Sequence, residues 1–366
     1  MEYTKLKCIN QYKSESINPT KTPDTVFEMY SVPIYETGHP EYLRGDEIAS
    51  NKVVVQKNDI LLCKINPRIN RVWVVSDESD KQNIASSEWI VIRNNEYNPE
   101  FLAWYFRTPK FQKLMTSEVT GIGGSLTRAQ PKCVAEYPVP VLDRKSQDEI
   151  VDILNKCKCV IDFRKKELLE LDDLIKARFV EMFGDINNNE NNWNCEPLGE
   201  LCTIVRGGSP RPIEQFLGGD VPWIKIGDAT DGDNIYLNST KEHIFQEGVK
   251  KSRLVKSGSL IFSNCGVSLG FARIITFDGC IHDGWLAMED IDVRLDKVFL
   301  LQALNQMTEH FKAIAPAGTQ PNLNTAIMKA YKQVIPPIEL QKEFIKFVEQ
   351  VNKSKVAAMN NKLSWC

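Results

Sequence analysis

The sequence lacks the features that mark membrane-spanning, secreted and metal-dependent proteins. No apolar run approaches the roughly 20 residues with which a helix crosses a bilayer. The start, Met1-Glu-Tyr-Thr-Lys5, has no apolar signal region, so we expect a cytoplasmic chain whose ten cysteines stay reduced. The closest cysteine pair, Cys157 and Cys159, has no second Cys-x-x-Cys or His-x-x-x-His partner. We therefore predict no disulfide, no metal site and no membrane association.

Signatures of catalysis are also missing. The Pro-Pro pair in Ile335-Pro-Pro-Ile338 offers neither the Asn or Asp nor the aromatic ring of an adenine methyltransferase motif. No Glu-x-Lys occurs, although metal-dependent nucleases of the common type use it to hold Mg²⁺. Gly121-Ile-Gly-Gly124 is not closed by Gly-Lys-Ser/Thr, so we interpret it as a turn rather than a phosphate loop. We predict a chain without a catalytic centre of its own.

The histidines leave open whether side chains distant in sequence form a site together. No two histidines have metal-ligand or triad-like spacing, although histidines distant in sequence can still converge in space. The four histidines are His39, His243, His282 and His310.

The formal net charge is -3, so the chain as a whole lacks the positive charge that is typical of proteins that bind nucleic acid. Any affinity for DNA must come from local patches or from a basic partner. The length of 366 residues exceeds what one hydrophobic core usually serves, so we expect two domains with connecting helices.

What the sequence does contain is a faint internal repeat, at an offset of roughly 197 residues. The stretches 53–61 and 254–261 both predict a turn that leads into a short buried strand. The stretches 101–111 and 299–311 both place apolar residues at helical spacing. A glycine-containing loop follows each helix, and both Leu126 to Pro140 and Leu323 to Pro337 are 14 residues apart. This spacing predicts that Leu126 matches Leu323.

A long segment free of proline and glycine follows each half, at about 146–182 and about 339–362. The first would span about 55 Å as a helix. Its apolar residues recur at 3-4 spacing and predict a coiled-coil seam of Ile150, Leu154, Cys157, Ile161, Leu168, Leu171, Ile175 and Met182. The second has a matching stripe of Phe344, Val348, Val351 and Ala358. We expect the two helices to pair antiparallel, the alternative being that each packs only onto its own domain.

The stretch Lys176-Ala-Arg-Phe-Val-Glu-Met-Phe-Gly-Asp185, followed by Trp193 and Leu198-Gly-Glu-Leu201, resembles a junction in the specificity subunits of type I restriction-modification systems. In that family it joins the first spacer helix to the second target-recognition domain. Further stretches stand in the family's order: Val221-Pro-Trp-Ile-Lys-Ile-Gly-Asp228, Gly318-Thr-Gln-Pro-Asn-Leu323 and Val334-Ile-Pro-Pro-Ile-Glu-Leu-Gln341. The resemblance covers essentially the whole chain. The first half has Met29-Tyr-Ser-Val-Pro33 and no clear counterpart of Trp-Ile-Lys-Ile.

This resemblance implies an α+β fold with two target-recognition domains, each built on a mixed or antiparallel sheet. Two long antiparallel coiled-coil helices would join them in a pseudo-twofold internal repeat. The domains would cover residues 1–143 and 187–338, and the spacer helices residues 144–186 and 339–366.

The same resemblance implies a function and a set of partners. The chain would read a bipartite target in double-stranded DNA and would not be an enzyme. Two modification (methyltransferase) subunits and restriction (translocase and nuclease) subunits would be its partners. S-adenosylmethionine, Mg and ATP would be bound in those partners, and no cofactor by this chain.

Candidates for DNA contact are polar and basic loop residues, because these make the bidentate and phosphate contacts by which DNA is bound and read. In the first domain they are Lys64, Asn66, Arg68, Asn70, Arg71, Ser125, Thr127, Arg128 and Gln130. In the second they are Arg206, Ser209, Arg211, Lys225, Asn264, Ser268, Arg273, Thr319, Gln320, Asn322 and Asn324. The Gly-rich loop 206–211 suits phosphate contact through backbone N–H groups. The alternative is that these are solvated loops, and that Lys225 and Arg273 extend from strands to solvent.

Two other function classes stay open. A fused type II-like restriction or methylation system also contains a DNA-recognition part. A coiled-coil scaffold that never contacts DNA would agree with the acidic charge balance. Loop cations gathered on one surface would favour DNA reading, and scattered cations would favour the scaffold.

Overall fold

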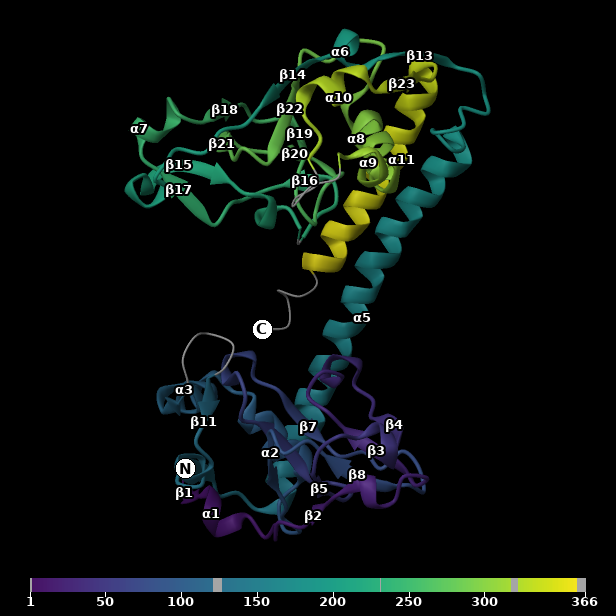
Figure 1. Cartoon of the computed structure of the whole chain (residues 1–366). Coiled ribbons are helices and arrows are strands. Elements are labelled where there is room, and N and C mark those ends of the chain that lie inside the picture. The colour runs from purple at the N-terminus through teal and green to yellow at the C-terminus, as the bar shows by residue number, and fades with distance from the viewer. Residues whose placement is uncertain (1, 121–126, 231, 317–321, 361–366) are drawn as a thin grey trace. The chain divides into compact units, whose positions relative to one another are not determined.

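The computed structural model of the chain describes residues 2–120, 127–230, 232–316 and 322–360, with side chains through Ala358. It divides into two compact units, Met1–Ile161 and Asp162–Cys366 (Figure 1). Each unit combines small sheets with helices, so the α+β fold class is confirmed. Among the described helices, none has the length and apolar character that crossing a membrane requires.

Unit 1 contains strands β1 (Tyr3–Lys5), β2 (Ser16–Ile17), β3 (Val26–Tyr30), β4 (Glu41–Arg44), β5 (Lys52–Val54), β6 (Ile60–Cys63), β7 (Val72–Val74), β8 (Gln82–Ala85), β9 (Trp89–Ile92), β10 (Val119–Thr120), β11 (Arg128–Ala129) and β12 (Pro138–Pro140). Its short helices are α1 (Leu6–Ile9), α2 (Pro99–Phe106), α3 (Pro109–Ser117) and α4 (Pro131–Val134). The strand orders are β2-β5-β8-β3-β4, β7-β6-β9, β1-β12 and β10-β11.

The apolar run of β6 is buried on both faces of its sheet. Ile60 and Leu62 pack in the core beneath α2 and α3. Leu61 and Cys63 point to the other face, into a cluster of tyrosine and tryptophan side chains. Four consecutive apolar residues therefore form a strand here rather than a helix turn.

Unit 2 contains strands β13 (Asn194–Pro197), β14 (Thr203–Arg206), β15 (Leu217–Ile224), β16 (Tyr236–Leu237), β17 (Glu242–Ile244), β18 (Arg253–Val255), β19 (Leu260–Ser263), β20 (Ala272–Ile275), β21 (Gly279–Ile281), β22 (Trp285–Glu289) and β23 (Lys332–Ile335). Its short helices are α6 (Leu198–Leu201), α7 (Gln246–Val249), α8 (Lys297–Gln306), α9 (Thr308–Ile314) and α10 (Thr325–Ala330). The strand orders are β14-β22-β19-β20-β16, β17-β15-β21-β18 and β13-β23.

The strand pairing repeats between the units. β3 runs parallel to β8 in unit 1, and β15 runs parallel to β21 in unit 2. Met29 lies opposite Ile84, as Trp223 lies opposite Cys280. The first half has no clear sequence counterpart of Trp-Ile-Lys-Ile, but Met29-Tyr30 occupies the position of Trp223-Ile224 in the sheet. The match escapes the sequence because the two strands share burial and register but no side chain.

The correspondence between the loop of unit 1 and the loop of unit 2 differs by three residues from the one that the sequence predicts. The N–H of Ala129 donates to the carbonyl of Lys64 over 2.9 Å, and the N–H of Leu323 donates to that of Asn264 over 2.8 Å. Ala129 therefore matches Leu323. Leu126, the predicted match, lies outside the described residues. Equal loop lengths alone could not fix the register.

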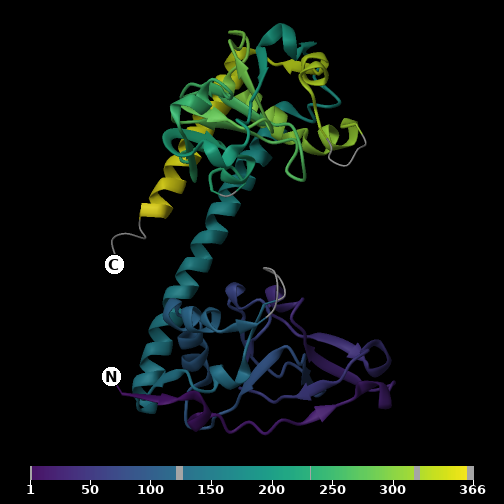
Figure 2. The same cartoon turned by 60° about the vertical axis from the view of Figure 1, so that its left-hand side comes forward.

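The long helices are α5 (Arg144–Phe183) and α11 (Ile338–Asn360). The last part of α5 pairs with α11 within unit 2, and the two lie side by side in both views (Figures 1 and 2). Arg178 bonds Glu343 at 3.3 Å, and Asp172 forms a buried ion pair with Lys355. Residue numbers rise along α11 as they fall along α5, which confirms the predicted antiparallel pairing for this part of α5.

Candidate nucleic-acid interface

The two candidate segments of unit 1 lie side by side. The first segment, residues 64–71, joins β6 to β7, and the second surrounds β11. The N–H of Asn66 donates to the carbonyl of Thr127 over 2.7 Å, and Ile65 forms an isolated bridge with Arg128. Two segments about 60 residues apart in sequence thus form one surface.

The asparagines of this loop shape its backbone. Asn66 and Asn70 adopt left-handed conformations, with φ of 47° and 52°, on either side of a short 3-10 turn, Pro67–Ile69. Asparagine tolerates this region better than most residues. The side-chain amide of Asn70 donates to the carbonyl of Arg107 over 3.1 Å. The loop therefore holds a fixed conformation, with Arg68 exposed and Lys64 and Arg71 half-buried.

Arg128 has an acidic partner in this surface. Its guanidinium donates two hydrogen bonds of 3.2 Å to Glu88, and the hydrogen bond and negative charge of Glu88 raise the pKa of the guanidinium. Gln130 donates to the hydroxyl of Thr120. Ser125 lies outside the described residues. Arg128 is held in place by Glu88, which contact with DNA would have to displace or share.

In unit 2, the predicted loop 206–211 is organised by Asp283. The Arg206 side chain donates to the carbonyl of Asp283 over 3.0 Å, and the Ser209 hydroxyl donates to its carboxylate over 2.8 Å. Arg211 lies 3.5 Å from the same carboxylate and stays mostly exposed. Glycine is required at position 207, because a Cβ there would stand 2.2 Å from the carbonyl oxygen of His282. Sequence and packing together place two arginines on one loop.

His282 adjoins this loop and was not among the sequence candidates. Its Nδ1 accepts from the N–H of Gly284 over 2.9 Å, and its Nε2 lies 2.9 Å from the Asp283 carboxylate. Burial lowers the pKa of His282; Arg211, Lys225 and Arg206 lower it further, against the opposing effect of Asp283. His282 and Trp223 line a cleft of about 440 Å³ behind the loop.

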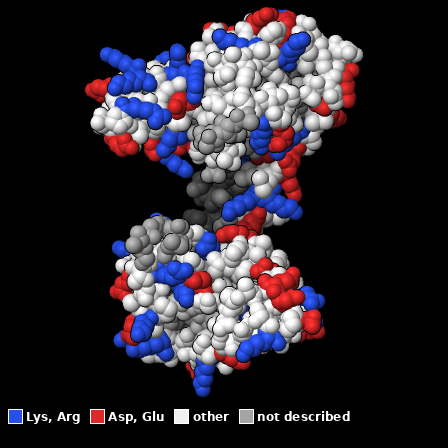
Figure 3. Space-filling view, viewed as in Figure 1, with Lys and Arg blue, Asp and Glu red and all other residues white. Residues whose placement is uncertain are grey.

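Further cations missed by the sequence interpretation lie against the same loop. The Ser252 hydroxyl donates to the carbonyl of Gly208 over 2.7 Å, which places the Lys250–Arg253 turn beside the arginines. We call Arg206, Arg211, Lys250, Lys251 and Arg253 the basic surface; all five are exposed. Lys and Arg side chains gather over α7, β15 and β18 in Figure 3. The run Val-Lys-Lys-Ser-Arg253 was the signal that could have identified them.

Two predicted residues of unit 2 are buried. Asn264 is fully buried, and its amide donates to Asn322 and to the carbonyl of Leu323, both over 3.2 Å. Arg273 is 7% exposed, and burial lowers its pKa to about 10. Its guanidinium donates to the carbonyl of Ala272 and to Asn234. Neither side chain faces solvent, so both support the fold and are not part of the candidate surface.

The remaining candidates of unit 2 are more accessible. Lys225 is half-buried and pairs with Glu242. Asn324 is exposed and caps α10, its side chain accepting from the N–H of Ile327 over 2.9 Å. Ser268 and Asn322 are half-buried, and Thr319 and Gln320 lie outside the described residues.

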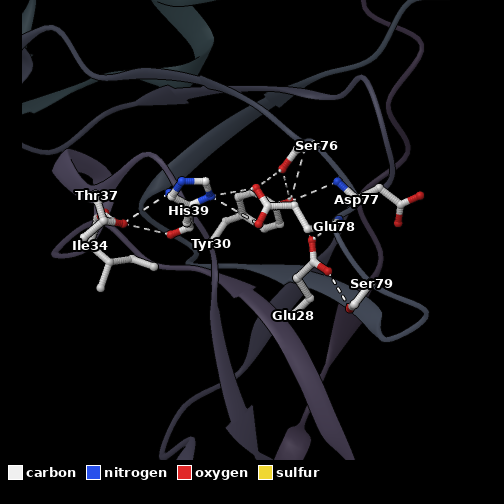
Figure 4. A network of polar contacts seen from close by, with 9 residues as sticks. All are labelled: Glu28, Tyr30, Ile34, Thr37, His39, Ser76, Asp77, Glu78 and Ser79. Atoms are coloured by element: carbon white, nitrogen blue, oxygen red, sulfur yellow. Dashed lines mark hydrogen bonds and ion pairs between the residues drawn. The ribbon is translucent and has the colours of Figure 1, made fainter.

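One polar network of unit 1 superficially suggests a catalytic triad. His39 Nδ1 lies 3.1 Å from the Glu78 carboxylate, and the hydroxyl of Ser76 donates to the same carboxylate over 3.1 Å (Figure 4). Serine and histidine thus both contact the acid, whereas a nucleophile needs its hydroxyl on the histidine. Tyr30 and Ser79 donate instead to the fully buried Glu28 (Figure 4). The network fastens the 76–79 loop to β3. In the part of the chain that is described, no three His, Cys, Asp or Glu side chains are grouped to hold a metal.

Comparison with known proteins identifies this architecture. Residues 190–364 match the family model of the type I restriction modification DNA specificity domain. Residues 190–364 belong to this family. The resemblance of the chain to type I specificity subunits is thereby confirmed. A curated relative is the type I restriction enzyme MjaIX specificity subunit of Methanocaldococcus jannaschii, 23% identical over 176 residues. That match covers 46% of this chain and 40% of the relative's length.

Solved structures extend the likeness in fold to both units of the chain. One is a chain from work on complex assembly and conformational transition of the type I R-M system, with a TM-score of 0.58 and 19% identity. The match covers 99% of this chain and 93% of the solved chain. The S subunit of a type I system from M. genitalium has a TM-score of 0.50 and 15% identity, over 99% and 92% of the two chains.

Proposed function

We propose that this chain is the DNA sequence-specificity subunit of a type I restriction-modification complex and reads a bipartite target. The proposal rests on one observation: the loops of the two units make equivalent backbone hydrogen bonds but have different side chains. The backbone of Lys64 in unit 1 corresponds to that of Asn264 in unit 2, and the backbone of Arg128 corresponds to that of Asn322. The side chains differ, because Lys64 and Arg128 are half-buried cations, whereas Asn264 is fully buried and Asn322 is a half-buried amide. Two units with one frame and two sets of side chains suit two different half-sites.

Affinity in unit 2 comes from the basic surface. Phosphate contacts supply much of the binding free energy and set the register of a protein on DNA, whereas base contacts specify the sequence. Exposed Lys and Arg side chains beside a glycine-containing loop suit the phosphate role. The net charge of the whole chain is -3, so this local concentration of cations matters.

Catalysis belongs to partner subunits in this proposal. Two modification subunits would bind S-adenosylmethionine and transfer the methyl group to a flipped adenine, and restriction subunits would use Mg and ATP. The chain itself would position them on the target and bind no cofactor. A fused type II-like system predicts methylation by this chain alone, and a scaffold predicts no DNA motif at all.

Mapping of methylated adenine tests the proposal. The chain is expressed in a methylation-free host with and without its cognate modification subunit. A bipartite motif with a fixed gap is expected only when both proteins are present. Methylation by the chain alone would make it an enzyme, and the lack of any motif would favour the scaffold.

A further inference from the structure

Unit 2 contains a small polar cavity between the last part of α5, the start of β20 and helices α8 and α9. Its volume is about 200 Å³, whereas pockets for drug-sized ligands measure roughly 300 to 1,000 Å³. Arg273 of β20, Gln302 and Asn305 of α8, and Asp172 and Lys176 of α5 are among the residues that line it. The cavity therefore suits a polar ligand of few atoms.

Arg273 brings a positive charge into the wall of this cavity. Its side chain is 7% exposed, and the described residues offer its guanidinium two neutral oxygens, the carbonyl of Ala272 at 2.8 Å and the side chain of Asn234 at 3.2 Å, but no ion pair. Its Nε has no hydrogen-bond partner among them. Burial lowers the pKa of Arg273, although the more distant Asp233 and Asp172 favour its charge. A buried charge without a close partner of opposite sign destabilises a fold.

The internal repeat shows that the sheet does not require a charge at this position. Arg273 lies opposite Ile261 in the pairing of β20 with β19, and Trp73 lies opposite Leu61 in the equivalent pairing of β7 with β6. Trp73 therefore stands in unit 1 where Arg273 stands in unit 2. Trp73 is also 7% exposed, and it packs on Tyr30 with ring centroids 4.9 Å apart. Because an aromatic ring fills the place in unit 1, the buried cation of unit 2 calls for another explanation.

Two amides in the lining have hydrogen-bond donors to spare. Gln302 is 5% exposed, and its side chain has no hydrogen-bond partner among the described residues. Asn305 accepts from the N–H of Ala272 over 2.6 Å through its side-chain oxygen, which leaves its NH₂ group without a partner there. Asp172, the one described carboxylate in the lining, is already paired with the buried Lys355. The groups that still lack a partner are thus mainly donors, which suit an anion.

We propose that this cavity binds a free small oxyanion, a phosphate or a carboxylate. One of its oxygens accepts from Nε of Arg273, and the others accept from the amides of Gln302 and Asn305. Charge-assisted hydrogen bonds from a guanidinium are among the strongest that a protein makes to such an anion. Because α5, β20 and α8 all line the cavity, the bound anion stabilises their packing on one another. The site contacts no DNA and does not depend on the proposed function.

Isothermal titration calorimetry of inorganic phosphate into the full chain, at constant ionic strength, tests the proposal. We expect saturable binding at one site, for which acetate competes. Arg273→Met removes the charge and should weaken binding at least about tenfold, and Gln302→Leu should weaken it a few-fold. Arg253→Met makes the same change at an exposed arginine of the basic surface and should leave the affinity for phosphate unchanged.

Thermal unfolding gives a second readout. Phosphate should raise the melting temperature of the wild type and of Arg253→Met more than that of Arg273→Met, because a ligand stabilises the state that binds it. The common stabilising effect of phosphate as a salt is the same for all three chains and cancels in this comparison. Circular dichroism checks that each variant folds, and Gln302→Leu provides the test if Arg273→Met does not.

Other outcomes would overturn the proposal. Equal affinity of the wild type, Arg273→Met and Gln302→Leu would do so, as would the absence of saturable binding. A loss of affinity in Arg253→Met alone would show that phosphate binds only to surface cations. Displacement of phosphate by duplex DNA of unrelated sequence would identify backbone phosphate as the ligand and would equally contradict a site for a free anion.

Discussion

The side chain of Gln147 accepts a hydrogen bond of 2.8 Å from the backbone N–H of Asn98 and joins the long helix α5 to the cap of α2. Its amide also donates to the carbonyl of Leu142 over 2.8 Å. Gln341 makes the same two kinds of bond in unit 2, to Asp296 and Pro336. One buried glutamine in each unit thus sets the angle at which a long helix leaves its domain.

Replacing Gln147 tests this role. Gln147→Ala leaves the half-buried N–H of Asn98 and the half-buried carbonyl of Leu142 without this partner, so we expect unit 1 to lose about 1 to 2 kcal/mol of unfolding free energy. Denaturant unfolding followed by circular dichroism measures the loss. Gln350→Ala, an exposed glutamine on α11, is the matched control. Equal stability of the two variants would show that the paired bonds contribute nothing.

The buried carboxylate of Glu28 should be as sensitive. It accepts from the Tyr30 hydroxyl at 2.8 Å, the Glu78 N–H at 2.9 Å and the Ser79 hydroxyl at 2.6 Å. Glu28→Leu removes the carboxylate that accepts all three hydrogen bonds, and we expect a loss of about 3 kcal/mol, with faster hydrogen exchange at residues 76–79. Glu28→Gln keeps the shape and should lose less. Unchanged exchange in both variants would contradict the role of the network.

Much of this fold follows from the sequence, because apolar periodicity and capping residues specify local structure. The apolar run of β6 and the helical spacing of apolar residues at 101–111 and 299–311 are of this kind. The correspondence between residues of the two halves was harder to predict. Met29-Tyr30 and Trp223-Ile224 share a position in the sheet but no side chain, so only strand pairing reveals the match. Leu126 and Leu323 look alike, yet backbone bonds match Leu323 to Ala129.

The candidate site was predictable only in part. Loop composition identified Arg206 and Arg211, but His282 joins them through long-range contacts that leave no local pattern. The run of residues 249–253 contains Lys251, but only the fold places that run beside the two arginines. The sequence also did not show which candidate residues are buried. Asn264 has the composition of a base-reading residue, whereas its amide is used inside the fold. Sequence reports which side chains are polar, and packing decides which of them reach solvent.

The basic surface predicts a salt-dependent loss of DNA binding. Changing Lys250, Lys251 and Arg253 to alanine removes cations that we propose contact phosphates, so affinity should fall alike for specific and unrelated DNA. The dependence of log K on log salt should become shallower by roughly one for each cation that no longer neutralises a phosphate. Electrophoretic shift or anisotropy at several salt concentrations measures both. Alanines at Lys312, Lys342 and Lys346 remove the same charge elsewhere in unit 2, and an equal effect there would contradict a localised surface.

The matched loop positions predict that specificity changes one half-site at a time. Lys64→Asn with Arg128→Asn replaces both half-buried cations of the unit 1 loops by amides. We expect the methylation motif to change in one half-site, while the gap and the other half-site stay the same. The reciprocal Asn322→Arg should change the other half-site. Mapping of methylated adenine reads both outcomes, and simultaneous change of the two half-sites would contradict separate readers.

The lowered pKa of His282 predicts a dependence of stability on pH. Burial, which disfavours the charged imidazole, and the nearby Arg211 place this pKa below the roughly 6.5 of an unfolded chain. Between the two pKa values the unfolded state binds more protons, so stability rises with pH there. The folded chain should therefore lose stability as pH falls below about 6.5, until His282 is protonated in both states.

His282→Asn removes this titration and should flatten the curve of melting temperature against pH between about pH 7 and pH 5. His243→Asn is the control for loss of a histidine from the same unit. DNA should oppose the effect, because a phosphate near Arg206 and Arg211 favours protonated His282. Affinity for DNA should then rise more steeply toward acid pH in the wild type than in His282→Asn. Parallel affinity curves, with the difference in melting temperature intact, would place His282 in the fold but outside the contact with DNA.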